Sequence, residues 1–81
     1  MKLKKNIAVS ESGFVFDPST GESFSLNNIG TEIVEYLKQD KSFEEIKKNM
    51  LEKYEVDSTS FEKYYYDFIN SLQQLKLIVD E

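Results

Sequence analysis

The segment Phe24-Ser25-Leu26-Asn27-Asn28-Ile29-Gly30-Thr31-Glu32-Ile33 changes from a strand pattern to a helical pattern without a spacer. Phe24 and Leu26 lie two residues apart with a serine between them, which is the period of a half-buried strand. Asn27 or Asn28 can then cap a helix, because an asparagine side chain accepts a hydrogen bond from the free amides of the first turn. The segment therefore predicts a strand that leads directly into a helix.

Two shorter strand patterns precede this junction. Ile7-Ala8-Val9-Ser10 and Phe14-Val15-Phe16 are rich in β-branched and aromatic residues. Asp17-Pro18-Ser19-Thr20-Gly21 is a turn signal, since proline presets its own φ and glycine accepts a positive φ. The third strand is expected over residues 22–26. Three consecutive strands with short connections most simply form an antiparallel meander.

Three helical patterns follow the strands. The first helix is expected over residues 28–38. Ser42 and Glu45 form a capping box that opens the second helix, and Thr59 and Glu62 repeat this device for the third. The apolar stripes of the three helices are Ile29, Ile33, Val34 and Leu37; Phe43, Ile46, Met50, Leu51 and Tyr54; and Phe61, Tyr64, Tyr65, Phe68, Ile69, Leu72 and Leu75.

The third helix is expected to end near residues 76–79, and no repeat or linker interrupts the chain. At 81 residues the chain has enough apolar side chains for one small core. The sequence therefore predicts a single α+β domain over residues 1–81, with a three-stranded antiparallel sheet followed by three helices.

The composition argues against catalysis. The chain has no Cys and no His, so thiol nucleophiles, thiolate metal sites, the commonest metal ligand and the usual general base near neutral pH are missing. The remaining carboxylates, lysines, tyrosines and hydroxyls form no triad, phosphate loop or metal constellation. We expect that the chain is not an enzyme and that it binds no cofactor.

The charge balance limits the partners. Ten basic residues stand against fifteen acidic ones, and the net charge of −5 repels phosphate backbones and acidic membrane surfaces. No apolar run is long enough for a signal peptide or a transmembrane span. We expect a soluble, cytoplasmic protein whose partners are neither nucleic acid nor membrane.

The run Tyr64-Tyr65-Tyr66 is the most unusual local feature. Three consecutive rings on a helix sweep about 300° and cannot all enter one core, so at least one must face solvent or a partner. One interpretation is two core or rim aromatics and one solvated ring. The other is that one or two of the rings form the wall of a peptide groove, because tyrosine combines apolar area with a polar tip.

The chain resembles the PqqD-like family, also called the RiPP recognition element, which acts as a peptide chaperone in pyrroloquinoline quinone biosynthesis and similar peptide modification. The family's signature is a Leu-Asn pair that ends the third strand, followed by a small residue and then Ile, and Leu26-Asn27-Asn28-Ile29 matches it. Ser42-x-x-Glu45-Ile46 resembles the family's second-helix opening, and Tyr54-x-Val56-Asp57 resembles the approach to its third helix. Phe68-Ile69 and Leu72 match its Phe-Leu-x-x-Leu spacing.

Two positions depart from the family pattern. Lys76 stands where a glycine commonly precedes the final Leu-Ile. Tyr64-Tyr65 stand where the family often has an acidic residue followed by an aliphatic one. The resemblance implies a winged-helix-like fold. The two departures affect which peptide side chains the family's binding groove would prefer in this chain.

The resemblance also implies a function and a site. In PqqD-like proteins the leader segment of a ribosomally synthesised precursor peptide binds as an added strand between the third strand and the third helix, for presentation to a modifying enzyme such as a radical SAM maturase or a peptidase. Any cofactor then belongs to that enzyme. By position, the peptide-binding residues are Glu22, Ser23, Phe24, Ser25 and Leu26 from the strand and Tyr64, Tyr65, Phe68, Ile69 and Leu72 from the helix.

Other interpretations stay open. On side chains alone, Phe24 and Leu26 can be core residues while Ser23 and Ser25 face water. The chain can instead be a protein–protein adaptor or a winged-helix DNA-binding regulator, although the third helix carries acidic residues and aromatics where a recognition helix needs basic or amide side chains. An open strand edge also permits a homodimer.

Overall fold

The computed structural model describes residues 2–79, so the first residue and the last two residues of the predicted domain range lie outside the described part. Three strands form an antiparallel meander in the order β2-β3-β4, as predicted. Val15 pairs with Phe24 and Phe14 pairs with Ser25. Ala8 pairs with Phe16 on the other side of β3. The strands span Ala8–Val9 (β2), Phe14–Asp17 (β3) and Glu22–Ser25 (β4).

The turn between β3 and β4 follows its sequence signal. Gly21 has a φ of 76°, which glycine adopts without strain. The backbone oxygen of Asp17 accepts a hydrogen bond from the Gly21 amide over 2.8 Å. The Asp17 carboxylate is buried, accepts hydrogen bonds from the amide and hydroxyl of Ser19 and pairs with Lys4 Nζ at 3.0 Å. These contacts fix the hairpin against the N-terminal segment.

Each helix begins at a side-chain cap. Asn27 caps α1 and Ser42 caps α2, where the Ser42 hydroxyl accepts a hydrogen bond from the Glu45 amide over 3.2 Å. The prediction that Thr59 caps the third helix is wrong, because Asp57 caps α3 by accepting from the Ser60 amide. The helices span Asn28–Lys38 (α1), Phe43–Lys53 (α2) and Ser58–Gln74 (α3).

The third helix ends earlier than predicted, and a second sheet follows it. After Leu75, Lys76 adopts a φ of 61°, and the Leu77 amide bonds back to the Leu72 oxygen over 2.9 Å. This closure turns the chain into β5 (Ile78–Val79), which pairs antiparallel with β1 (Lys2–Leu3). Strands of two residues carry no readable period, so the sequence did not predict this pair.

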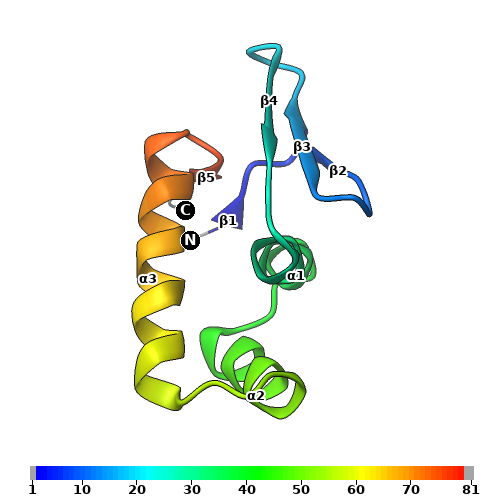
Figure 1. The fold of residues 1–81 in the computed structure, drawn as a ribbon. Helices are drawn as coiled ribbons and strands as arrows, with labels where there is room; N and C mark the ends of the chain where they lie inside the picture. Colours follow the sequence, from blue (N-terminus) through cyan, green and yellow to red (C-terminus); the bar gives the residue numbers. More distant parts are fainter. Residues whose placement is uncertain (1, 80–81) are drawn as a thin grey trace.

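Figure 1 shows α1 end-on between the three-stranded sheet and α2, with α3 running along one side. The paired strands β1 and β5 are drawn between α3 and the sheet. Apolar side chains from the sheets and from all three helices meet in one core, as the α+β prediction required. The buried apolar residues are Ile7, Val15, Ile33, Val34, Leu37, Ile46, Met50, Phe61, Tyr65, Ile69, Leu72, Leu77 and Ile78.

Candidate functional site

The outer edge of β4 is open. In the strand order β2-β3-β4, β3 lies on one side of β4, and within residues 2–79 no strand lies on the other side. The Leu26 amide donates to the Gly13 oxygen over 2.8 Å, one residue beyond the Phe14–Ser25 pair. In an antiparallel ladder this pattern makes Phe14–Ser25 a non-hydrogen-bonded pair and Val15–Phe24 a hydrogen-bonded one.

The main chain of β4 therefore offers unpaired groups at alternate residues. The N–H and C=O of Phe24 point toward β3, whereas those of Ser23 and Ser25 point away from it. A row of outward N–H and C=O groups is a template on which another extended chain can pair. The backbone of β4 can thus bind a peptide with little dependence on that peptide's side chains.

The side chains of β4 divide between two faces, as the alternation predicted. Phe24 and Leu26 are half-buried and pack against the core. Ser23 and Ser25 are exposed on the opposite face, where they pair with Phe16 and Phe14. The remaining predicted strand residue is Glu22, which is exposed at the start of β4. Apolar side chains therefore lie on the helix side of the open edge.

Asn27 joins β4 to both α1 and α3. Its Oδ1 accepts a hydrogen bond from the Gly30 amide over 2.7 Å, which decides the cap between the two asparagines in favour of Asn27. The same Oδ1 accepts from the Tyr64 hydroxyl over 3.3 Å. Its backbone oxygen accepts from the amide and hydroxyl of Thr31. The end of β4 is thereby fixed next to the middle of α3.

Two aromatic rings of α3 lie against this junction. Tyr64 and Phe68 stack with ring centroids 6.1 Å apart and an interplanar angle of 8°. A Cβ at Gly30 would lie 3.1 Å from Phe68 Cε1, so the ring packs directly over the first turn of α1. Both rings are half-buried. Together with Phe24, Leu26 and the outward main-chain groups of Ser23 and Ser25, they make up what we call the β4–α3 face.

The other three predicted helix residues lie in the core. Tyr65 is 3% exposed and Leu72 is 2% exposed, and Ile69 is also buried. Burial raises the pKa of the Tyr65 hydroxyl. Their side chains pack inward, so the structure brings only Tyr64 and Phe68 of the five predicted helix residues to the half-buried layer beside β4.

The tyrosine run behaves as its helical geometry requires. Tyr65 is buried, Tyr64 is half-buried and Tyr66 is 56% exposed. The Tyr66 ring stacks on Phe43 of α2 with centroids 5.6 Å apart, on a different side of α3 from Tyr64. The prediction that one ring must leave the core is confirmed, and only Tyr64 lies beside β4.

Sequence reasoning did not predict the roles of Asn27 and Gly30 in holding α3. Gly30 is a weak helix former in the first turn of α1, and such a residue often marks a close packing contact. The sequence also gave no reason to expect exposed aromatic rings on β3. Phe14 is 54% exposed and Phe16 is 44% exposed.

Within residues 2–79 no group of three or more acidic side chains is placed to hold a metal ion. Over the same residues no helix has both the length and the apolar character needed to cross a membrane.

A family model described as coenzyme PQQ synthesis protein D (PqqD) matches residues 13–78, which hold both β4 and α3. The chain belongs to the PqqD family. No curated protein matches the chain at a significant level. Among solved structures, this chain is similar to TbiB1 in complex with the TbiA(β) leader peptide. The two sequences are 27% identical, the TM-score is 0.86, and the match covers 99% of this chain and 100% of TbiB1.

A second solved structure is a lasso peptide synthetase B1 complexed with the leader peptide. It is 24% identical, with a TM-score of 0.84, and the match covers 98% of this chain and 96% of the other. At this identity the likeness shows that the two chains share the PqqD-family fold.

Proposed function

We propose that this chain binds the leader segment of a ribosomally synthesised precursor peptide as an added strand along the open edge of β4. The observation that carries the proposal is the outward direction of the N–H and C=O groups of Ser23 and Ser25. Membership of the PqqD family and the likeness to TbiB1, which was solved with a leader peptide, support this class of ligand.

In this proposal the main chain supplies affinity and the apolar side chains set the register. An added strand places alternate side chains toward the helices, where Phe24, Leu26, Tyr64 and Phe68 offer half-buried apolar surface. The buried residues Tyr65, Ile69 and Leu72 support α3 from the core, and Glu22 lies at the far end of the strand.

The chain itself is not an enzyme in this proposal. It holds the leader and raises the effective concentration of the rest of the precursor at the active site of a separate modifying enzyme, such as a radical SAM maturase or a peptidase. Any cofactor belongs to that enzyme. Precursor peptides are translated in the cytoplasm, so the proposal locates the encounter there.

Proline and alanine at Ser23 test the strand addition. Ser23→Pro removes one outward N–H without removing a bond to β3, whereas Ser23→Ala keeps that N–H. With the fluorescently labelled leader of a small precursor encoded beside the gene, we expect Ser23→Pro to weaken binding at least tenfold and Ser23→Ala to leave the affinity unchanged. Equal affinities for the two variants would overturn strand addition at this edge.

Phe24→Asp tests the apolar part of the same face. The Phe24 side chain packs against the core beside β4, so a carboxylate there would be desolvated by a bound peptide. We expect this variant to lose leader binding in the same titration. The exposed residue Asn70 of α3 gives a matched control, since Asn70→Asp adds the same charge outside the β4–α3 face and should bind as the wild type does.

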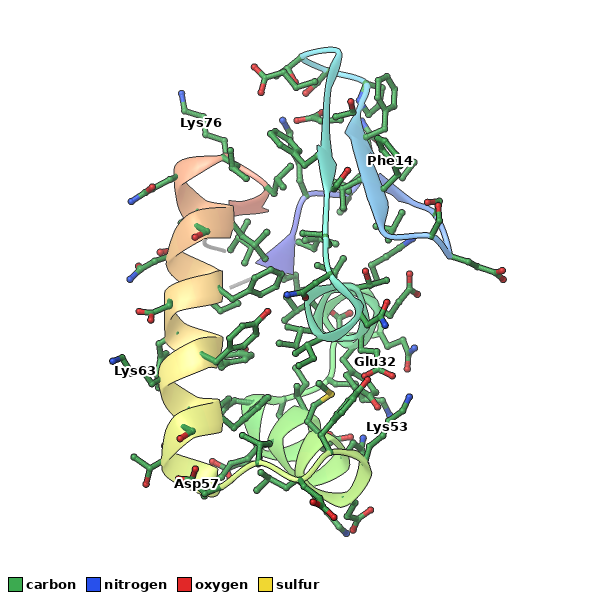
Figure 2. All side chains as sticks on the ribbon, viewed as in Figure 1. Phe14, Glu32, Lys53, Asp57, Lys63 and Lys76 are labelled. Carbon is green, nitrogen blue, oxygen red and sulfur yellow. The ribbon has the colours of Figure 1, made fainter. Side chains whose placement is uncertain are left out.

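A protein–protein adaptor is the second candidate function, and the exposed rings of Phe14 and Phe16 favour it. Figure 2 shows Phe14 on the side of the sheet away from α3. The double change Phe14→Ser and Phe16→Ser should leave leader binding intact if the β4–α3 face is the peptide site. If this variant, unlike the others, no longer binds a modifying enzyme, the rings of Phe14 and Phe16 are the contact site for that enzyme.

The open edge can also pair two copies of the chain. Antiparallel pairing of β4 with its own copy would form a homodimer, which must compete with the leader for the groups of Ser23 and Ser25. Sedimentation of the chain with and without leader decides this point, since such a dimer dissociates when leader is added.

A further inference from the structure

A cavity of about 430 Å³ opens where α1, α2 and α3 meet, beyond the end of β4. Buried Met50 and Phe61 are among its lining residues. The half-buried lining residues are Ile29 of α1, Tyr54 at the end of α2 and Tyr64 of α3, and the remaining lining residues are exposed. The full lining is Ile29, Met50, Tyr54, Glu55, Val56, Ser60, Phe61 and Tyr64.

The lining chemistry selects for apolar groups. Three aromatic rings and a methionine thioether face one cavity, and rings and thioethers make favourable contacts with apolar side chains, aromatic ones included. Glu55 is the one charged residue among the lining side chains, and it is exposed. An anionic ligand group would lose its hydration here without a partner of opposite sign. A cavity of this size and character fits a bulky apolar side chain.

The cavity is continuous with the β4–α3 face through one residue. Tyr64 lines the cavity, stacks on Phe68 and donates a hydrogen bond to Asn27. Ile29, two residues after Asn27, lines the same cavity. A chain paired with β4 and extended past Asn27 therefore passes the Tyr64 ring and reaches the cavity next.

We propose that this cavity is a second recognition site for the leader peptide, in which one bulky apolar side chain of the leader inserts beyond the segment that pairs with β4. This inference rests on the proposed function and adds to it a specificity element built by the helices. The leader is then recognised at two points, by main-chain pairing at β4 and by side-chain burial between Tyr54 and Tyr64.

The first test uses toluene, which carries the ring of an apolar side chain and no backbone. Ser60 is an exposed residue of the lining, so Ser60→Phe fills the cavity from its rim. Lys63 is exposed on α3, is not among the lining residues and points away from α1 and α2 in Figure 2, so Lys63→Phe is the matched control.

Toluene at millimolar concentration should shift the amide resonances of Val56, Ser60 and Tyr64 in the wild type and in Lys63→Phe. The same resonances should not respond in Ser60→Phe. Val56→Asp, which places a carboxylate in the lining at an exposed position, should also abolish the response. Shifts that are absent from the wild type, or equal in all four proteins, would overturn the inference.

The second test uses the leader peptide. Ser60→Phe should weaken leader binding about tenfold while the leader-induced shifts at Ser23 and Ser25 persist, and Lys63→Phe should bind as the wild type does. Equal affinities of the two variants, with β4 still responding, would overturn the cavity's role and leave strand addition standing. Failure of the wild type to bind leader would overturn the proposed function and this inference with it.

Discussion

The Tyr64 hydroxyl donates a hydrogen bond to Asn27 Oδ1 over 3.3 Å, and this contact joins the middle of α3 to the residue that ends β4. Asn27 Oδ1 also accepts from the Gly30 amide, so one side-chain oxygen serves as helix cap and as tether. These two hydrogen bonds therefore fix the distance between the open edge of β4 and the aromatic rings of α3. They do so at Asn27, where β4 ends and α1 begins.

Removal of this tether should have a small effect on stability. Tyr64→Phe loses a long and partly exposed hydrogen bond but keeps the ring that stacks on Phe68, so we expect a loss of about 0.5 kcal/mol in the free energy of unfolding. Tyr66→Phe, at an exposed ring, is the control and should change nothing. Urea denaturation measures both, and a loss above about 2 kcal/mol for Tyr64→Phe would contradict the tether's modest role.

The packing of Phe68 over Gly30 predicts a stronger effect on binding. Gly30→Val places a branched side chain where a Cβ already approaches Phe68 Cε1 to 3.1 Å, so the ring must move. We expect leader affinity to fall about tenfold, or about 1.4 kcal/mol. Glu35→Val, at an exposed position of α1, is the control. Unchanged affinity for Gly30→Val would show that the Phe68 ring position does not matter for the leader.

The sequence predicted the order of the main elements because their signals are local. The alternation of Phe24 and Leu26, the turn at Gly21 and the caps at Asn27 and Ser42 each depend on residues a few positions apart. Asp57 rather than Thr59 caps α3, because the helix starts one residue before Thr59 and Asp57 lies at its border. The pairing of β1 with β5 joins residues from the two ends of the described chain, Lys2 with Val79 and Leu3 with Ile78, and two-residue strands carry no period.

Part of the candidate site was predictable because it also depends on local sequence signals. Strand alternation assigns Phe24 and Leu26 to the apolar side, but the helical period alone does not say which side of α3 faces β4. Tyr65, Ile69 and Leu72 share one helical stripe with Tyr64 and Phe68, but they are buried in the core, whereas Tyr64 and Phe68 are half-buried. The three-helix cavity depends on how the helices meet, which no local pattern encodes.

Lys76 offers a stabilising substitution. Its φ of 61° lies in the left-handed region, at the position of a helix-ending motif where glycine is favoured, and the family's glycine at this position is explained in the same way. Lys76→Gly should raise the free energy of unfolding by about 1 kcal/mol. Gln74→Gly, in the last turn of α3, should lower it by about 0.5–1 kcal/mol. A loss of stability for Lys76→Gly in chemical denaturation would contradict the assignment.

Stability should fall in acid through Asp17. Hydrogen bonds from the Ser19 hydroxyl and the Lys4 ammonium hold the pKa of Asp17 below its ordinary value of 3.8. A carboxylate whose pKa is lower in the folded state contributes stability above its unfolded pKa and loses that contribution as the pH falls through the folded value. The urea midpoint should therefore decrease as the pH is lowered below 3.8.

Asp17→Asn distinguishes the contribution of Asp17 to the loss of stability in acid from the contributions of the other carboxylates. The variant should be less stable than the wild type at neutral pH, and the difference between the two should narrow as the pH falls, because protonation removes the same charge from the wild type. Asp67→Asn, at an exposed position, is the control and should follow the wild type. A constant difference across the acid range would show that the Asp17 charge does not contribute.

Hydrogen exchange of the β4 amides tests strand addition most directly. In the free protein the Phe24 amide faces β3 and should exchange slowly, whereas the amides of Ser23 and Ser25 face away from the sheet and should exchange fast. Saturating leader peptide should slow exchange at Ser23 and Ser25 at least tenfold and leave Phe24 little changed. A leader that binds tightly while both serine amides still exchange at their free rates would contradict the account.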